Sequence, residues 1–404
     1  MADYKLSYTG DQVNEAVGKA LTIDALQAEV DMILSIVTGN TPDWNSIVQM
    51  VRNNYGPKMF PVGSKLSVSS SKYGSISLDV VGHNINKATG DASKPTMTLM
   101  MHGVIYGTPY DAEEATWGNT TSAALPAGTY TFMLDHAANN GGTGEDGTYH
   151  FTTTKPIPVG GAWRHDLIGA WRESNSDYKP ANITGGTITT YDENRIAIES
   201  GLTVTTGSSG TVLGTASRYK QYIVDTVGSF NSTKRSAYGC NRYSNSAIRQ
   251  WVESTAAANQ WWVKQNAFDL PPDYANQAGL LNGMDSQFID ALGSVDVVTA
   301  LSFEFDGGGS ETISAKVFLA SLTEMGLGNN DSIAEGTAFP YYSDATATDR
   351  IKYDLTNTQT ARAWWLRSPN VYTEESANFV NTSGATQGLA VPNNYGTSVV
   401  FVIY

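Results

Sequence analysis

The stretch Ala363-Trp364-Trp365-Leu366-Arg367-Ser368-Pro369 determines how the C-terminal part of the chain is organised. Adjacent residues of a strand point to opposite faces, so at least one of the two tryptophans is expected to be buried. The planar guanidinium of Arg367 carries five donors and can join several backbone carbonyls or a carboxylate. Pro369 ends the strand because it has no backbone N–H to donate. The stretch therefore predicts a buried strand with a polar anchor.

A polar segment follows this strand and precedes a second hydrophobic one. Residues 370–396 are rich in Asn, Tyr, Thr, Ser and Gly, and residues 398–404 are typical of a buried strand. Tyrosine offers rigid contact area and Asn, Ser and Gly offer adaptable hydrogen bonding, a combination that also suits sugars. The alternative interpretation is that these residues only form turns. The candidate ligand-binding residues are Asn370, Tyr372, Asn378, Asn381, Asn393, Asn394 and Tyr395.

The Trp-Trp-Leu-Arg-Ser-Pro motif, with its polar segment and terminal strand, resembles an uncharacterised family of lectin-like domains. Members of that family occur in bacteria and in tail or head fibre proteins of their phages, and the fold resembles C-type lectins and the formylglycine-generating enzyme. Three further stretches resemble parts of the same family. Residues 60–64 with 78–83 resemble its opening hairpin, residues 241–251 its central helix, and residues 316–324 a later strand-to-helix turn.

The resemblance assigns structural roles within these motifs to five residues, namely Trp364, Trp365, Arg367, Arg249 and Trp251. It also implies that the C-terminal region is the ligand-facing surface. One departure is visible, because the family usually has Val-Arg-Pro before its last strand and this chain has Thr397-Ser398-Val399-Val400. That departure concerns the packing of the final strand.

Composition excludes several classes of partner. The chain has 404 residues, enough for two or three domains, and its 39 Gly and 21 Tyr against 16% charged residues indicate a loop-rich, β-heavy protein. The net charge of −14 argues against nucleic acid and against an anionic membrane, since both favour Lys/Arg clusters. The acidity indicates simple solubility or, alternatively, structural Ca²⁺ held by surplus carboxylates. No other cofactor is expected.

A single cysteine, Cys240, rules out an internal disulfide and the paired-cysteine copper chemistry of the formylglycine-generating enzymes. It is expected to be a small buried residue. The N-terminal residues lack the basic and apolar regions of a signal peptide, and no run approaches the roughly 18 apolar residues of a membrane helix. We therefore expect synthesis in the host cytoplasm, and the resemblance to phage fibre proteins implies a final location in a virion.

The N-terminal region predicts a coiled coil. Residues 9–12 read as a capping box, and apolar residues then recur in steps of three and four at Ile23, Leu26, Val30, Ile33 and Val37. The first residues also resemble the N-terminal attachment segment of phage fibre proteins. Two interpretations remain open, a helix packed on its own domain and a short multi-chain coiled coil that trimerises the protein.

The patterns divide the chain into five segments. Residues 1–40 are the attachment and coiled-coil helix, residues 41–57 a short helix and linker, and residues 58–104 the first part of the lectin-like domain. Residues 105–200 form a β-rich insertion, because residues 128–134 and 147–153 alternate as a hairpin. Residues 201–404 are the main part of the domain, with helices expected in 241–256 and 288–292. The predicted fold class is α+β.

Enzyme chemistry finds little support. The five histidines lack metal-ligand spacing, and neither a nucleophile elbow nor a phosphate-binding loop is present. Adjacent acids such as Glu113-Glu114 and Glu374-Glu375 usually mark a solvated face rather than the two sides of a glycosidase cleft. Asp344 to Asp349 matches no calcium-loop signature. We expect a protein without enzymatic activity.

Taken with these patterns, the resemblance implies a phage structural protein, a tail or head fibre or spike. It would be a homotrimer attached to other virion proteins by its N-terminal segment, and its C-terminal loops would bind a host surface glycan or protein, without nucleic acid and without membrane insertion. The alternative is a decoration or baseplate protein whose lectin-like domain contacts other virion proteins.

Overall fold

The structure is a computed structural model of the 404-residue chain. It describes residues 18, 23, 26–27, 30, 43–112, 116–119, 122–135, 147–165, 187–194, 196–217, 222–223, 240–265, 271–303, 306–372 and 376–404. Within these residues helices and sheets are mixed and strands predominate, which agrees with the α+β prediction at that coarse level. None of the helices in the described part has the length and apolar character needed to cross a membrane.

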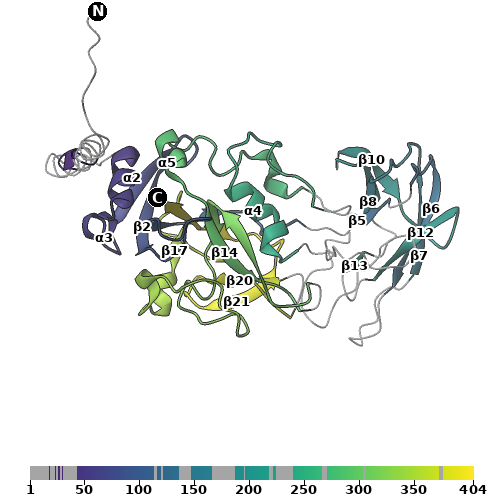
Figure 1. Cartoon of the computed structure of the whole chain (residues 1–404). Helices are drawn as coiled ribbons and strands as arrows, with labels where there is room; N and C mark the ends of the chain where they lie inside the picture. Colours follow the sequence, from purple (N-terminus) through teal and green to yellow (C-terminus); the bar gives the residue numbers. More distant parts are fainter. Residues whose placement is uncertain are drawn as a thin grey trace, which may run out of the picture.

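Two five-stranded sheets form the centre of the main domain (Figure 1). The first is antiparallel throughout and has the order β1 (Lys65–Ser70), β2 (Gly74–His83), β3 (Met97–Met101), β23 (Val399–Ile403), β16 (Val317–Leu319). The second has the order β21 (Thr386–Ala390), β20 (Ser376–Val380), β19 (Trp364–Pro369), β22 (Gly396–Thr397), β4 (Ile105–Tyr106). In the second sheet β19 and β22 pair in parallel and the other neighbours are antiparallel.

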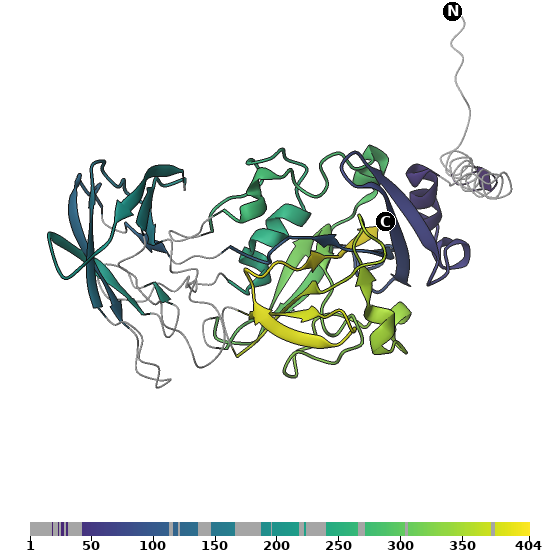
Figure 2. The same ribbon diagram turned by 180° about the vertical axis from the view of Figure 1, so that it is seen from behind.

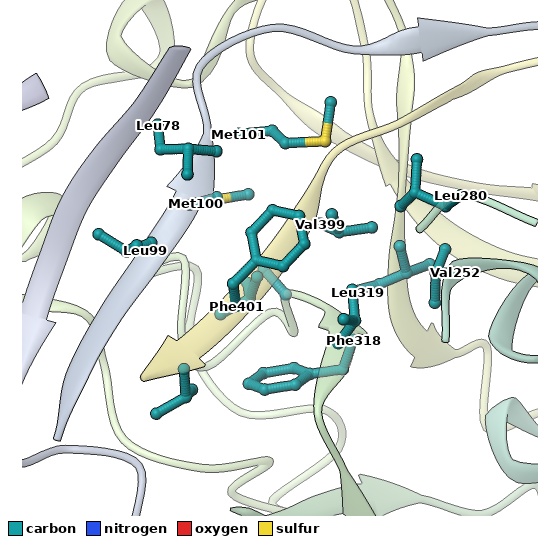
Figure 3. Close-up of a cluster of buried hydrophobic side chains, with 14 of the residues drawn as sticks. Leu78, Leu99, Met100, Met101, Val252, Leu280, Phe318, Leu319, Val399 and Phe401 are labelled. Atoms are coloured by element: carbon teal, nitrogen blue, oxygen red, sulfur yellow. The ribbon is translucent and has the colours of Figure 1, made fainter. Parts of the chain in front are cut away.

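The core lies around β23, whose five residues are all buried. Such a continuous apolar run fits a strand that is covered on both faces. Figure 3 shows Phe401 of this strand among Leu99, Met100 and Phe318 from the neighbouring strands. On α5 (Ser286–Ala291), Phe288 packs edge-on against Phe401 with ring centroids 5.1 Å apart. The terminal strand predicted from residues 398–404 therefore lies at the centre of the main domain.

The helix α2 (Trp44–Arg52) belongs to this core, although the sequence suggested a short helix and linker there. Asp43 caps it by accepting a hydrogen bond from Ser46 N at 3.0 Å. Trp44 lies 4.6 Å from the ring of Phe288, and the buried face of the helix also contains Ile47, Val48, Met50 and Val51. A short helix α3 (Gly56–Met59) follows. The short helix expected within residues 41–57 is present, and its apolar face packs against α5.

The β-rich insertion lies at the end of the molecule opposite α2 (Figures 1 and 2). Its sheets have the orders β10-β9-β8-β5 and β11-β7-β6-β12-β13. The bounds are β5 (Thr116–Gly118), β6 (Gly128–Asp135), β7 (Gly147–Thr153), β8 (Ala162–His165), β9 (Thr187–Tyr191), β10 (Ala197–Thr203), β11 (Thr205–Thr206), β12 (Thr211–Ser217) and β13 (Tyr222–Ile223). As predicted, β6 and β7 form a hairpin.

The limits of the insertion differ from the expected 105–200. The strand β4 pairs with β22 of the main domain, so the described strands of the insertion begin at β5. At the other end β12 pairs in parallel with β6, and β13 pairs with β12, which extends the insertion to residue 223. The limits of the insertion depend on pairing between strands that are far apart in the sequence. Local residue patterns carry no information about such pairing.

Shorter elements complete the main domain. Before α4 (Ala247–Val252) lies the 3-10 helix η3 (Tyr243–Asn245), and β16 leads into turns at residues 321–326 rather than into the expected helix. The remaining elements are η4 (Asp273–Asn276), η5 (Pro340–Tyr342), η6 (Ala347–Arg350) and the hairpins β14 (Val295–Ala300) with β15 (Ser310–Ala315) and β17 (Lys352–Tyr353) with β18 (Ala361–Arg362).

A buried lysine lies under the second sheet. Lys352 donates hydrogen bonds from Nζ to Met101 O at 2.5 Å and His102 O at 3.3 Å, and Nζ is 5.5 Å from the ring centroid of Trp364. Burial lowers the pKa of Lys352 from 10.5 to about 8, and the charge of Asp79 opposes that shift. The charged form of Lys352 therefore costs the folded state free energy at neutral pH.

This shift makes the stability pH-dependent. Between pH 8 and 10.5 the unfolded chain holds more protons at this site than the folded chain, so the free energy of unfolding rises with pH. Relative to Lys352→Met, the wild-type chain should gain up to about 3 kcal/mol between pH 8 and 10.5 in urea unfolding. The same substitution at exposed Lys58 is the control. Equal pH dependence in wild type and Lys352→Met would contradict the prediction.

Candidate functional site

Both tryptophans of β19 are buried, on opposite faces of the strand. Trp364 Nε1 donates to Arg350 O and Trp365 Nε1 to Thr108 O, each at 3.2 Å. Buried indole N–H groups need such partners, so each ring is fixed in orientation as well as in depth. The strand is thereby held to η6 on one side and to the segment after β4 on the other.

Arg367 is the centre of a buried polar network in the main domain. Its guanidinium is buried and donates to three backbone carbonyls, Val298 O at 3.1 Å, Leu319 O at 2.9 Å and Glu335 O at 2.6 Å. It also forms a two-pronged ion pair with Glu324, at 2.5 Å and 2.9 Å. All five donors face partners contributed by β14, β16 and residues 324–335. One side chain therefore joins four segments of the main domain.

A second buried carboxylate, Glu335, extends this network. It accepts hydrogen bonds from Ala300 N at 2.9 Å and from the hydroxyl of Ser368. Burial raises the pKa of Glu335 because the charged form is removed from water, while Arg367 opposes that shift. Ser321 Oγ donates to Glu335 O at 2.7 Å and closes the network on the turn after β16.

Asparagine side chains fasten the backbone where β19 ends. Asn378 Nδ2 donates to Ser368 O at 3.2 Å and Pro369 O at 2.9 Å, and Asn330 Nδ2 also donates to Pro369 O, at 2.9 Å. Asn241 Nδ2 donates to Asn370 O at 3.0 Å and Ser376 O at 2.9 Å. The carbonyls of Ser368, Pro369, Asn370 and Ser376 thus have hydrogen-bond partners within the domain.

Three of the candidate ligand-binding asparagines serve this internal structure. Asn378 lies in β20 with its amide directed at the backbone, and Asn370 Oδ1 accepts from Tyr372 N at 3.1 Å. Asn381 Oδ1 shapes the turn between β20 and β21 by accepting from Ser383 N at 2.9 Å and Ala385 N at 3.1 Å. For these residues the turn-forming interpretation fits the structure, because much of 370–396 is the paired strands β20, β21 and β22.

The candidates near the end of this segment lie beside β22. Tyr395 is half-buried, with its ring centroid 4.4 Å from Phe379 and 5.0 Å from Trp365, and burial raises the pKa of its hydroxyl. Asn394 is exposed and Asn393 partly so. Tyr395 therefore packs into the domain with Phe379 and Trp365, whereas the exposed side chain of Asn394 is accessible to a ligand.

Tyr372 is a candidate whose side chain projects into solvent. Its side chain is 65% exposed, and its ring lies 5.7 Å from that of Phe303, which is 44% exposed. The Tyr372 hydroxyl donates to Asp331 Oδ1 at 2.7 Å, and this bond raises the pKa of the tyrosine. We name Phe303, Tyr372 and Asp331 the aromatic platform. The sequence analysis missed Phe303 and Asp331, because only tertiary packing brings them to Tyr372.

A backbone hydrogen bond and a close glycine contact hold the Phe303 side of the platform. Phe303 N donates to Val371 O at 2.8 Å, which ties the two aromatic segments together. Gly308, with φ +73°, lies under the Phe303 ring, and a Cβ there would stand 2.3 Å from Phe303 Cδ1. Any residue other than glycine at position 308 would therefore displace the ring.

Asp331 sits in a strained turn. Asp331 and Ser332 have φ of 46° and 71°, and Asn330 and Ile333 on either side exchange two backbone hydrogen bonds of 3.0 Å. Two successive left-handed residues without a glycine are uncommon and cost free energy. The turn is nevertheless anchored from Asn330 to Pro369, and it aims the Asp331 carboxylate at Tyr372. Strain maintained by surrounding contacts is frequent at binding sites.

The two residues singled out in the central helix motif, Arg249 and Trp251, make contacts within the main domain. Trp251 is buried in α4, donates from Nε1 to Ala278 O at 2.9 Å, and packs edge-on against Tyr274 at 5.6 Å. Arg249 donates from Nη1 to Ser244 O at 3.0 Å and pairs with Glu253 at 3.4 Å. Within the described part of the chain, neither residue contacts Phe303, Tyr372 or Asp331 through a hydrogen bond or a ring contact.

The acidic, histidine and cysteine residues that were weighed as catalytic or metal-binding candidates are not part of the aromatic platform. Asp349 caps η6 with Thr346, and the described residues contain no group of three His, Cys, Asp or Glu side chains placed to hold a metal ion. Glu113-Glu114 and Glu374-Glu375 fall outside the described residues. His102 Nδ1 lies 2.8 Å from Asp79 Oδ2, and His83 and His150 contact backbone carbonyls. Cys240 is buried, as expected, and its Sγ accepts a hydrogen bond from Arg242 N at 3.3 Å.

The Arg367 network should dominate local stability. Arg367→Met would leave Glu324 and three carbonyls buried without their donor, so we expect a loss of about 3–5 kcal/mol in the free energy of unfolding by urea. Arg362→Met is the matched control, since Arg362 pairs with Asp354 while one third exposed (32%), and should cost about 1 kcal/mol. Similar losses in the two variants would contradict the assignment.

Comparison with known proteins gives one finding. A family model described as a domain of unknown function (DUF6273) matches residues 216–404, the part that contains the Arg367 network and the aromatic platform. Searches of curated proteins and of solved structures returned no match. The C-terminal part of the chain is therefore similar to this domain.

Proposed function

We propose that this chain is a phage virion structural protein, a tail or head fibre or spike, that binds a host surface receptor, glycan or protein, through its C-terminal lectin-like region. The observation that carries the proposal is the exposed aromatic platform mounted on the buried Arg367 network. The motif resemblance of residues 363–369 supports the lectin-like assignment.

The platform has the physical features of a recognition surface. Two neighbouring large aromatic rings, 65% and 44% exposed, give up hydrophobic burial that a purely structural pair would keep. Their backbone is fixed by Phe303 N to Val371 O and by the Tyr372 hydroxyl bond to Asp331. A surface that is already ordered loses less conformational entropy on binding.

The N-terminal helix supports assembly into a trimer. Residues 18, 23, 26, 27 and 30 are helical, and the seam residues Ile23, Leu26 and Val30 are 62%, 54% and 55% exposed in the single chain. The seam residues Ile33 and Val37 lie outside the described residues. Apolar side chains at this spacing are covered when helices of several copies associate. Three tips held together would convert weak single contacts into strong attachment.

Trimerisation through the seam can be tested by charge substitution. In Leu26→Glu/Val30→Glu, burying the carboxylates between helices is unfavourable, so the variant should be monomeric by light scattering after gel filtration. Gln27→Glu, on the same turn but off the seam, should keep the wild-type mass. A wild-type monomer at micromolar concentration would contradict the trimer and favour a helix that packs on its own domain.

Receptor binding can be tested with labelled full-length protein on intact candidate host cells. The variant Phe303→Ala/Tyr372→Ala should lose at least about ten-fold in cell binding, because exposed aromatic anchors commonly dominate such contacts. Tyr353→Ala, which removes another exposed tyrosine (44%), is the control, and circular dichroism checks folding. Unchanged binding by the double variant would move the site elsewhere. Failure of the wild type to bind any host would favour the decoration or baseplate alternative.

A further inference from the structure

We propose that the aromatic platform is a subsite for an uncharged hexopyranose ring of a glycan, with Phe303 and Tyr372 stacking on the sugar and Asp331 accepting hydrogen bonds from its hydroxyls. The inference rests on the proposed receptor-binding function and specifies its ligand class. It adds two residues, Phe303 and Asp331, that the sequence did not indicate.

The rings provide the apolar half of the subsite. Phe303 and Tyr372 are tilted by 41° with centroids 5.7 Å apart, so together they present a shallow, bent apolar surface. One face of a pyranose ring carries mainly C–H groups, which pack on aromatic faces.

Asp331 provides the polar half. Its Oδ1 accepts a hydrogen bond from the Tyr372 hydroxyl, and its Oδ2 has no hydrogen-bond partner among the described residues. The side chain is exposed beside the rings, so Oδ2 is accessible to a ligand. A carboxylate is an acceptor with room for several donors, and sugar hydroxyls are donors. Hydrogen bonds to a charged acceptor are stronger than those between neutral groups. The strained turn at Asp331 and Ser332 fixes this acceptor next to the stacking surface.

Charge selects the kind of sugar. Asp331 carries its carboxylate without an ion-pair partner among the described residues, whereas Asp306 and Glu311 nearby in the Phe303 loop and β15 are paired with Arg242. The chain as a whole has a net charge of −14. A uronic or sialic acid would bring a second carboxylate against Asp331, and such like-charge contacts are unfavourable. Neutral hexoses and N-acetylhexosamines avoid this repulsion.

Saturation-transfer NMR on the full chain tests the inference, with the methyl glycosides of mannose, galactose, glucose and N-acetylglucosamine as neutral probes. Glucuronic acid and N-acetylneuraminic acid serve as acidic probes. We expect at least one neutral glycoside to bind with a Kd of about 1 mM, as a single small ring allows, and neither acid to bind.

Variants then locate the subsite. Tyr372→Ala and Phe303→Ala should each weaken the neutral glycoside by at least about ten-fold, and Asp331→Asn by several-fold, because the amide keeps one acceptor oxygen. Tyr372→Phe, which keeps the ring, should lose less than Tyr372→Ala. Tyr353→Ala should leave binding unchanged. Each substituted side chain is exposed, so circular dichroism should show an unchanged fold.

The outcomes separate this inference from the receptor function. No binding of any neutral glycoside by the wild type up to about 10 mM, preference for an acidic sugar, or binding indifferent to Tyr372→Ala would each overturn the sugar subsite. If cell binding in the same variants still depends on Tyr372, the receptor function stands, and its ligand is an acidic glycan where an acidic sugar binds and a protein where no sugar binds. If cell binding is absent while a neutral glycoside binds, the subsite stands and the receptor function fails.

Discussion

The buried ion pair between Arg367 and Glu324 is the interaction on which the C-terminal half of the main domain depends. Its guanidinium also binds carbonyls of Val298, Leu319 and Glu335, so the ends of β14 and β16, the segment 324–335 and β19 meet at one side chain. Burying two charges is costly, and the cost is offset only when every donor and acceptor is satisfied, as it is for Arg367. The neighbouring Glu335 adds a carboxylate whose raised pKa reflects the same dry surroundings.

This rigid base explains how polar and strained features persist above it. The amides of Asn330, Asn378 and Asn241 fasten the backbone around Pro369 and Asn370, and the left-handed turn at Asp331 is held by Asn330. Phe303 and Tyr372 can then stay exposed without loosening the fold. A pre-ordered patch of this kind suits weak contacts that are repeated across several copies of a protein.

Much of the local structure follows from the sequence, and less of the site does. The period-two pattern predicts the hairpin β6–β7, and the pleat predicts the burial found at Trp364 and Trp365. The donor count of Arg367 likewise predicts a residue that joins several carbonyls and a carboxylate. Composition overestimates the number of ligand-binding residues in segment 370–396. The sequence alone does not distinguish an asparagine that binds a ligand from one that hydrogen-bonds to the backbone of a turn or strand. Phe303 and Asp331 were not predictable, since they reach Tyr372 only through non-local packing.

Hydrogen exchange of the full chain, bound and unbound to the surface of a sensitive host, tests the central claim most directly. Binding should protect backbone amides of residues 301–303, 306–309, 330–333 and 370–372, while amides of β19 and β23 stay protected in both states because they are buried and paired. Protection confined to the insertion, β5 to β13, or to the N-terminal helix would contradict it and place recognition on another surface.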